Sequence, residues 1–229
     1  MTAMVSMPPA TTERCRQLLQ RWRQDLRLTR REQGLLRGEL TLLDRQLQRL
    51  EHKVLRLAVF GRVGVGKSSL INALVGQRLL ETDVAHGSTR RQQAVTWPLK
   101  LDGLQRVELI DTPGIDEIDA AGRTRLATRV AMGVDLVLLV IDSDLTRCDR
   151  DALETLQASG KPVRLVLNRS DRWPEEQLPE LLDSIRSRLP SDLPLTAVAA
   201  APRQPMLDAD GRVRSSAAPA RVSNLKQQL

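Results

Sequence analysis

The chain has 229 residues and a formal net charge of +7, and 41% of its residues are hydrophobic, which suits one α/β domain with an appendage. Its first residues lack the charged region and apolar core of a secretory signal. No uninterrupted apolar run reaches the ~18 residues that a membrane span needs, so we expect a cytoplasmic protein. The two cysteines, Cys15 and Cys148, follow no metal or disulfide spacing and are expected to be free thiols.

The basic excess lies in the flanks of the chain. Residues 12–56 carry twelve Lys or Arg against six Asp or Glu, and the tail from residue 201 carries five against two. Such flanks can contact RNA, the ribosome included, or an anionic membrane surface to which the protein binds peripherally. A solvated helix face accounts for the same charges without any partner.

Residues 1–11 are expected to be disordered, and a helical pattern begins at about residue 12. Mostly apolar residues from Leu19 and Trp22 to Val54 recur at alternating steps of three and four, with polar breaks at Thr29 and Gln33, which is typical of an a/d heptad seam. Gly34 and Gly38 interrupt it, so residues 12–54 are predicted to form a basic amphipathic helix with one bend or a helical hairpin. The apolar stripe can pack on the following domain, on an absent C-terminal helical part, or on another copy. A homodimer is expected to form either through this helix or through the following domain.

A glycine-rich motif, GRVGVGKS at residues 61–68, follows the apolar run of residues 55–60. It matches G-x-x-x-x-G-K-[ST] and lies between a predicted buried strand and a predicted helix at residues 69–75. Backbone N–H groups of such a turn point at one anion. Lys67 is expected to place its ammonium on the β- and γ-phosphates, and Ser68 to offer its hydroxyl to Mg²⁺.

The remaining pattern alternates strands with helices. Residues 77–91 read as a polar loop, 93–101 as an edge strand, 102–103 as a hairpin turn and 106–110 as the next strand. Helices at about 120–132, 149–159 and 174–189 then alternate with strands at 134–141, 162–167 and 193–199. This order predicts a mostly parallel sheet with helices on both faces and one antiparallel edge strand. Residues 201–220 have linker composition, and 221–229 resemble the start of a truncated helix.

Two further motifs follow predicted strands. Asp111-Thr112-Pro113-Gly114 comes after an apolar strand, as a Walker-B aspartate does, so Asp111 is expected to reach Mg²⁺ through a water. Gly114 lacks a Cβ, which lets its backbone N–H approach a γ-phosphate. In the loop before the edge strand, Thr89 is the candidate hydroxyl that closes on Mg²⁺, with Ser88 as the competing choice.

The run Asn168-Arg169-Ser170-Asp171 ends the strand at 162–167. A carboxylate at Asp171 can accept hydrogen bonds from guanine N1–H and from the exocyclic N2 amine, whereas adenine would leave that charge unpaired. Asn168 is expected to join this loop to the glycine-rich turn at residues 61–68, called here the phosphate loop. An ordinary strand-to-helix turn with Asn and Asp as caps is the alternative.

Together, GRVGVGKSS, STR, DTPG, NRSD and a last strand ending in Ala199-Ala200 resemble the Era/TrmE-like branch of Ras-like small GTPases over residues 55–200. The resemblance implies a three-layer G domain with a six-stranded sheet, with Thr89 in the first switch and Gly114 in the second. It implies catalytic roles for Lys67, Thr89 and Gly114 and metal contacts from Ser68, Thr89 and Asp111. The implied phosphate-binding set is Gly61, Val63, Gly64, Val65, Gly66, Lys67, Ser68, Ser69, Asp111 and Gly114, and the implied guanine-binding set is Asn168, Arg169, Asp171, Ala199 and Ala200.

The whole chain also resembles bacterial GTPases with an N-terminal helix and a C-terminal hydrophobic domain of unknown function, a domain that is absent here. The expected function is a Mg²⁺-dependent switch that binds GTP and GDP. The alternatives are a nucleotide-gated scaffold, a membrane-associated (dynamin-like) or ribosome-associated module with negligible turnover, and an ATP-driven enzyme.

Several positions depart from the family pattern. Arg169 stands where the family usually has Lys, Ala199 where it has Ser, and Gly64 where potassium-stimulated relatives have Asn. Ile115 stands where Ras-type enzymes have the glutamine that orients water, so hydrolysis is expected to be slow. Arg62, Arg90, Arg91 or a partner remain the candidates for the missing catalytic charge.

Overall fold

The computed structural model describes residues 9–82, 92–116, 118–207 and 213–229, with side chains from residue 13 onward. The chain divides into two compact units. The helical unit comprises residues 1–55 together with 98–107, and the nucleotide unit comprises residues 56–97 together with 108–229. No helix within the described ranges is long and apolar enough to cross a membrane.

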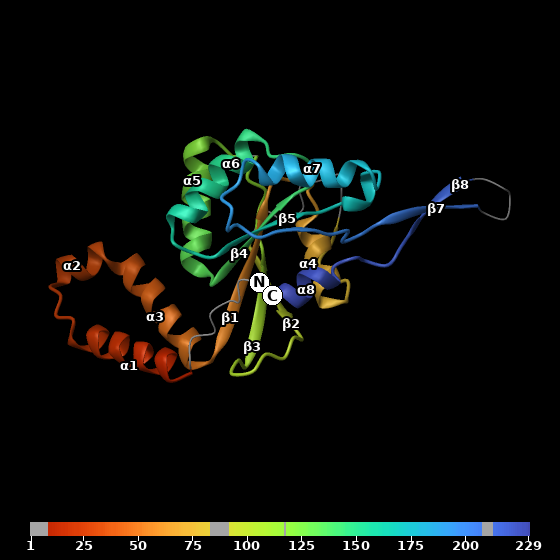
Figure 1. Cartoon of the computed structure of the whole chain (residues 1–229). Helices are drawn as coiled ribbons and strands as arrows, with labels where there is room; N and C mark the ends of the chain where they lie inside the picture. Colours follow the sequence, from red (N-terminus) through yellow and green to blue (C-terminus); the bar gives the residue numbers. More distant parts are fainter. Residues whose placement is uncertain (1–8, 83–91, 117, 208–212) are drawn as a thin grey trace. The chain divides into compact units, whose positions relative to one another are not determined.

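The helical unit contains three helices, α1 (Pro9–Asp25), α2 (Arg30–Leu35) and α3 (Arg37–Glu51), and α1 packs on α3 (Figure 1). One break, at Leu36 between α2 and α3, lies within residues 33–38 as expected from Gly34 and Gly38, whereas the other break, after α1, was not expected. Thr29 causes it, because its hydroxyl accepts a hydrogen bond from Glu32 N while the Glu32 carboxylate accepts one from Thr29 N at 2.8 Å. This capping box starts a new helix, and four residues separate it from the end of α1.

Arg23 of α1 and Asp44 of α3 join the two helices through a bidentate ion pair, with Nε–Oδ1 at 2.9 Å and Nη2–Oδ2 at 3.1 Å. The outward side of α1 carries Leu18 and Trp22, which are 59% and 53% exposed. The heptad pattern had placed Trp22 in the buried seam. It is exposed because the capped break after α1 ends the continuous helix that the seam requires.

The nucleotide unit is built on a six-stranded, mostly parallel sheet with one antiparallel strand, in the order β2-β3-β1-β4-β5-β6. β1 pairs in parallel with β4, β4 with β5, and β5 with β6. β4 is buried at every residue, as expected for a central parallel strand. The strands are β1 (Val54–Gly61), β2 (Gln93–Trp97), β3 (Arg106–Asp111), β4 (Leu136–Ile141), β5 (Val163–Leu167) and β6 (Leu195–Ala197).

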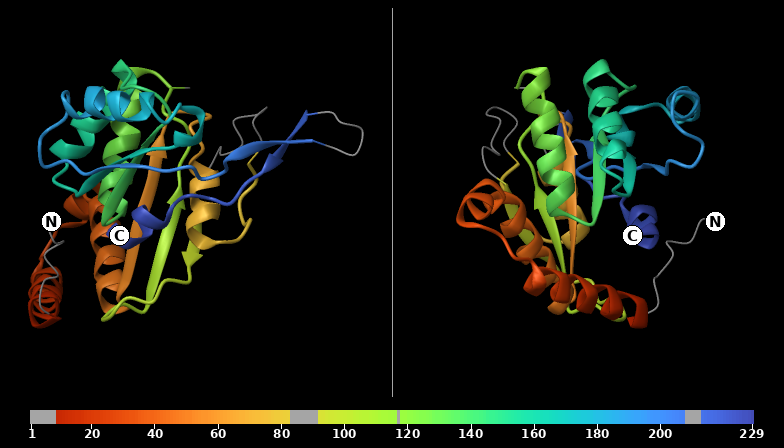
Figure 2. Two further views of the ribbon diagram at one scale, coloured as in Figure 1. Left: turned by 45° about the vertical axis from the view of Figure 1, so that its right-hand side comes forward. Right: turned by 90° about the vertical axis from the view of Figure 1, so that its left-hand side faces the viewer.

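Helices cover both faces of this sheet, which gives the expected three layers (Figure 2). α5 (Ala120–Gly133), α6 (Arg147–Ala158) and α7 (Gln177–Arg186) pack on the face that carries Phe60, Leu139 and Leu165. Alternate strand positions such as Arg164 and Thr196 point to the opposite face. That face holds α8 (Ser223–Gln228), and α4 (Lys67–Val75) follows the turn after β1.

The C-terminal segment differs from the expectation at residues 201–220, which were predicted to be a linker, whereas a short helix is present within residues 221–229. Residues 201–220 contain an antiparallel hairpin of β7 (Arg203–Leu207) and β8 (Val213–Ala217), in which Arg203 Nε donates to Ser215 Oγ at 2.7 Å. α8 is docked on the sheet, because Leu225 is fully buried and Gln228 Oε1 accepts from Arg164 and Thr196 at 2.7 and 2.6 Å. Composition suggested a linker, but the strand pairing and the buried Leu225 make this segment part of the nucleotide unit.

Candidate functional site

The glycine-rich turn connects the end of β1 to the start of α4. Gly61 and Gly66 have φ values of +147° and +89°, which favour glycine. Lys67 is 7% exposed, and its Nζ donates to the carbonyl oxygens of Gly61 at 3.0 Å and Arg62 at 2.7 Å. The loop therefore wraps around its own lysine and keeps the N-terminus of α4 open toward an anion.

Ser68 and Asp111 lie side by side at the start of α4 and the end of β3. Ser68 Oγ donates to Asp111 Oδ2 at 2.6 Å, and Asp111 is 1% exposed. A hydroxyl and a carboxylate at this separation fit Mg²⁺, which prefers oxygen ligands and keeps other positions for water and phosphate. The described residues contain no group of three or more His, Cys, Asp or Glu suited to a metal.

Gly114 packs directly against Val63 of the phosphate loop. A Cβ built on Gly114 would lie 2.1 Å from Val63 Cγ2 and 2.8 Å from Val63 N, so only glycine fits. The next two side chains have different surroundings. Ile115 is fully buried in the core, whereas the Asp116 carboxylate accepts a hydrogen bond from Val63 N at 2.6 Å. Sequence reasoning did not single out Asp116.

Asn168 joins three loops. Its Nδ2 donates to Val65 O of the phosphate loop at 2.9 Å, and its Oδ1 accepts from Ala200 N at 3.1 Å. The side chain is 2% exposed. Asp171 lies three residues later in the short 3-10 helix η1 (Ser170–Arg172), which Ser170 N anchors to Val198 O at 3.0 Å. This arrangement places the asparagine, the aspartate and the phosphate loop at one edge of the sheet.

The amides of Ala199 and Ala200, expected to face the guanine oxygen, are both engaged within the protein. Ala199 N donates to Arg221 O at 3.1 Å, and Ala200 N donates to Asn168 Oδ1. The cause is the bridge that residues 199 and 221 form as the chain leaves β6. Ala201, the next and exposed residue of the loop, becomes the better candidate for the base-contacting amide.

The arginine candidates for the missing catalytic charge separate into two groups. Arg90 and Arg91 lie outside the described residues, as do Thr89 and Ser88. Arg62 is already held by two carboxylates, Asp142 at 3.2 Å from its Nη2 and Asp149 at 3.2 Å from its Nε. Burial raises the pKa of the neighbouring Cys148 thiol, so this side chain adds no charge at neutral pH.

Arg169 extends the same ion-pair network to the loop of residues 168–171, called here the base loop. Its Nη1 donates to Asp142 Oδ2 at 2.8 Å, so one carboxylate pairs with both Arg62 and Arg169. Sequence reasoning missed Asp142 and Asp149. The signal for Asp142 was its place directly after the buried run of β4, the same place that Asp111 has after β3.

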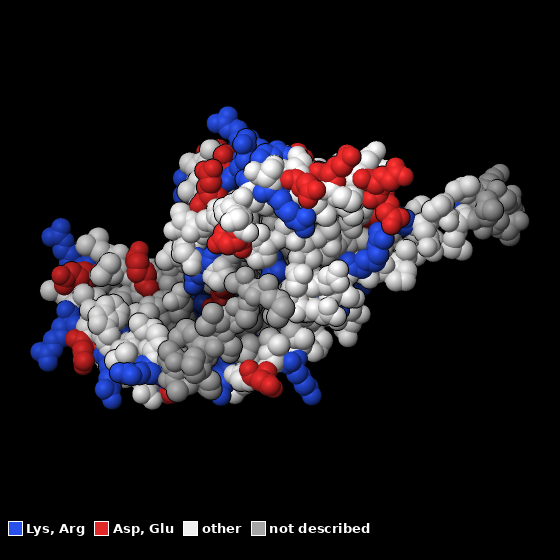
Figure 3. Space-filling view, viewed as in Figure 1, with Lys and Arg blue, Asp and Glu red and all other residues white. Residues whose placement is uncertain are grey.

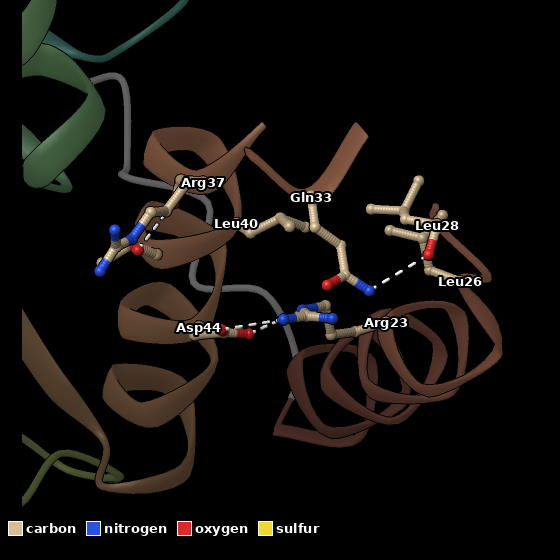
Figure 4. Close-up of a pocket in the computed structure, with 8 residues that line it drawn as sticks. Arg23, Leu26, Leu28, Gln33, Arg37, Leu40 and Asp44 are labelled. Carbon is tan, nitrogen blue, oxygen red and sulfur yellow. Dashed lines mark hydrogen bonds and ion pairs between the residues drawn. The ribbon is translucent and has the colours of Figure 1, made fainter. Parts of the chain in front are cut away.

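A cavity of about 350 Å³ lies in the helical unit, away from the motif residues in sequence (Figure 4). The Arg23–Asp44 pair and Gln33, whose Nε2 donates to Leu28 O at 3.1 Å, form part of its wall. Because none of the motif residues lines it, this cavity is a feature of the helical unit and not of the candidate site. It is lined by Arg23, Leu26, Leu28, Gln33, Arg37, Leu40, Thr41 and Asp44.

Comparison with known proteins agrees with this geometry. The family model described as "50S ribosome-binding GTPase" matches residues 56–169. GTPase Era from a Synechocystis species is 37% identical over 132 residues, which cover 55% of this chain and 40% of that protein. The chain belongs to the Era-like P-loop GTPases.

Another relative and a solved structure also match part of the chain. GTPase Der from Rhizobium johnstonii is 43% identical over 121 residues, which cover 50% of this chain. A crystal structure of Era in complex with MgGDPNP and nucleotides 1506–1542 of 16S ribosomal RNA superimposes with a TM-score of 0.55 and 25% identity. That match covers 65% of this chain and 51% of the Era chain. The Era-like chain spans 25% of the length of the Der relative.

Proposed function

We propose that this chain is a Mg²⁺-dependent molecular switch that binds GTP and GDP and hydrolyses GTP slowly. The position of Asn168 carries the proposal, because its side chain bonds the phosphate loop and Ala200 at once and so fixes the loop of Asp171 beside the phosphate loop. Asp171 then selects guanine, Arg169 lies along the base, and Ala201 supplies the amide. Lys67 and the loop amides hold the phosphates.

Ser68 and Asp111 would hold Mg²⁺, which when bound neutralises charge on the β- and γ-phosphates. Gly114 brings the second switch against Val63, and Thr89 is proposed for the first switch.

A triphosphate would displace the Asp116 carboxylate from Val63 N, because two anions cannot share this amide. Loss of the γ-phosphate would let that contact reform, which is the conformational change of the switch.

Titration of the full chain with GTP, GDP and ATP, each with Mg²⁺ and with excess EDTA, tests the proposal. We expect guanine nucleotides to bind at least a hundredfold tighter than ATP, and GTP to lose affinity when Mg²⁺ is removed. ATP binding at the affinity of GTP would contradict guanine selection. GTP binding that EDTA leaves unchanged would contradict the metal role of Ser68 and Asp111.

The positions of Ile115 and Arg62 support the proposal of slow hydrolysis. Ile115 is fully buried, so position 115 does not present a side chain to an attacking water. Arg62 is held in ion pairs with Asp142 and Asp149. We therefore expect single-turnover hydrolysis on the order of the unassisted Ras-type rate or slower, about 10⁻⁴ per second. A rate a hundredfold higher without any partner would contradict this assignment.

Ile115→Gln gives a direct test of that reasoning. We expect no acceleration of GTP hydrolysis, because the side chain at this position points into the core. The buried amide should lower the free energy of unfolding by about 2–4 kcal/mol. Urea denaturation and single-turnover hydrolysis measure both effects, with Ile115→Val, expected to cost about 1 kcal/mol, as the matched control. An accelerated Ile115→Gln variant would show that this segment leaves the core in the GTP state.

A second function is favoured by the surface of the helical unit. Lys and Arg side chains, interspersed with Asp and Glu, project from this unit (Figure 3), and Leu18 and Trp22 of α1 are exposed. We propose that this unit contacts an anionic partner of the cytoplasm, either ribosomal RNA, as the Era complex suggests, or an anionic membrane surface. A homodimer through α1 is the alternative.

Binding measured with a 16S ribosomal RNA fragment, with anionic vesicles and with neutral vesicles separates these partners. RNA binding should weaken steeply with salt. Vesicle binding should depend on anionic lipid and decrease in Trp22→Ser. Concentration-dependent sedimentation without either partner would identify the homodimer, and absence of all three interactions would contradict a docking role for the helical unit.

A further inference from the structure

Asp142 connects the two halves of the candidate nucleotide site. It follows β4 and uses each carboxylate oxygen for a different arginine: Oδ1 lies 3.2 Å from Arg62 Nη2, and Oδ2 lies 2.8 Å from Arg169 Nη1. Arg62 belongs to the phosphate loop and Arg169 to the base loop. The two loops therefore share the carboxylate of Asp142, a residue that belongs to neither motif.

A buried aspartate, Asp149, anchors the ion-pair network formed by Arg62, Asp142 and Arg169. Asp149 is fully buried, and its Oδ1 lies 3.2 Å from Arg62 Nε. Its Oδ2 accepts hydrogen bonds from Thr146 N at 3.1 Å and Thr146 Oγ1 at 2.6 Å, in the capping box that starts α6. Arg62 is thus fixed from both sides, and the two arginines and two aspartates balance in charge. This arrangement restricts the orientation of Asp142.

Arg169 needs such a restraint. It has φ +58° and ψ +33°, a left-handed conformation that residues with a Cβ adopt rarely and keep only where their surroundings impose it. Arg169 directly precedes η1, which carries Asp171. The ion pair with Asp142 holds the Arg169 side chain, and with it the turn that orients Asp171.

This network is unlike an ordinary surface ion pair. The side chains of Arg62, Asp142 and Arg169 are 21%, 20% and 25% exposed, and each guanidinium is partly removed from water. Isolated exposed pairs contribute little, whereas a shared and partly buried carboxylate couples its partners. Arg also fits this role better than the Lys usual in the family, because its planar fork can pair with Asp142 while its stem lies along a base.

We propose that Asp142 is a positioning residue that couples phosphate binding at the Arg62 loop to guanine recognition by the Arg169–Asp171 loop. This inference rests on the proposed guanine nucleotide function. Phosphates that order Arg62 would, through Asp142, also order Arg169 and Asp171. Affinity and base selectivity would then both depend on a residue that does not touch the nucleotide.

The direction in which Asp142→Asn changes GDP affinity distinguishes a positioning role from a purely electrostatic one. Asp142→Asn removes a negative charge near the phosphate loop, which by charge alone would strengthen binding of an anionic nucleotide. Loss of positioning predicts the opposite. We expect GDP affinity to fall about tenfold in Asp142→Asn, within the range usual for coupling between sites.

Base selectivity provides a second readout. Inosine diphosphate lacks the N2 amine that Asp171 accepts from, so the ratio of GDP to inosine diphosphate affinity reports on the orientation of Asp171. We expect this ratio to fall severalfold in Asp142→Asn and in Arg169→Met. A merely structural loss would weaken both nucleotides equally and leave the ratio unchanged.

Asp144→Asn is the matched control. Asp144 lies two residues along the same loop and pairs with Arg188 on the surface, with side chains 45% and 38% exposed. The substitution makes the same change of charge without touching either arginine of the network. Its GDP affinity and its base ratio should match those of the natural chain.

A mutant cycle completes the test. The effects of Arg62→Met and Arg169→Met on GDP affinity should be non-additive in the natural chain and additive when Asp142 is Asn. If the natural chain fails to bind GDP, the proposed function itself is wrong. If it binds GDP but Asp142→Asn keeps both the affinity and the base ratio, only the positioning role is overturned. If Asp142→Asn does not fold, as judged by circular dichroism, the ratio of GDP to inosine diphosphate affinity in Arg169→Met decides. A fall in this ratio supports the positioning role, and an unchanged ratio overturns it.

Discussion

Asp171→Asn is expected to weaken GDP binding roughly a thousandfold and to make xanthosine diphosphate the preferred ligand. A site that hydrogen-bonds a polar group rejects the analogue lacking it by large factors, because buried polar atoms are left unpaired. The Asp171 carboxylate can accept from guanine N1–H and from the N2 amine. An asparagine amide presents a donor in place of one acceptor, which suits the oxygen that xanthine carries at that position.

Fluorescence titration or calorimetry with GDP, xanthosine diphosphate and ADP measures the change in preference. Arg172→Gln is the matched control, since Arg172 is an exposed residue of the same short helix, η1. It should leave the order of affinities unchanged. If Asp171→Asn still prefers GDP by the factor seen in the natural chain, another residue reads the base and the assignment of the Asn168–Asp171 loop is wrong.

The features that the sequence predicted are those set by local pattern. The buried strands β1, β4 and β5 appear as short continuous apolar runs because both faces of a central parallel strand are covered. The phosphate loop and the Asp111 motif have fixed spacing, and their neighbours on the chain place them at strand ends. The fold class and the position of these motifs at strand ends therefore follow from segments of about ten residues.

The features that sequence missed depend on contacts between distant segments. Arg62 meets Asp142 across 80 positions, and no local pattern selects Asp142 from the other acidic residues that end strands. The exposure of Trp22 follows from the Thr29 capping box, which outweighs a heptad pattern that is otherwise regular. The amides of Ala199 and Ala200 are engaged because the chain returns at Arg221 to pair with the same loop. Each of these outcomes requires the tertiary structure.

Gly61→Ala is expected to lower the free energy of unfolding by about 4 kcal/mol, the sum of backbone strain and overpacking. Gly61 has a φ of +147°, and a Cβ at this position would lie 2.3 Å from the carbonyl oxygen of Val140, its register partner on β4. The clash is with backbone of a buried strand, so no side-chain rotation relieves it. β1 and β4 would have to separate at the point where the phosphate loop begins.

Gly64→Ala is the matched variant in the same loop. Gly64 also has a positive φ, +78°, but nothing lies within 4 Å of a Cβ built there. Only the backbone strain remains, about 1 kcal/mol. Urea denaturation followed by circular dichroism should therefore place the Gly61→Ala midpoint well below that of Gly64→Ala, or yield no folded Gly61→Ala protein at all. Equal midpoints would mean that the β1–β4 pairing yields at Gly61, and that glycine is present there for the approach of phosphate alone.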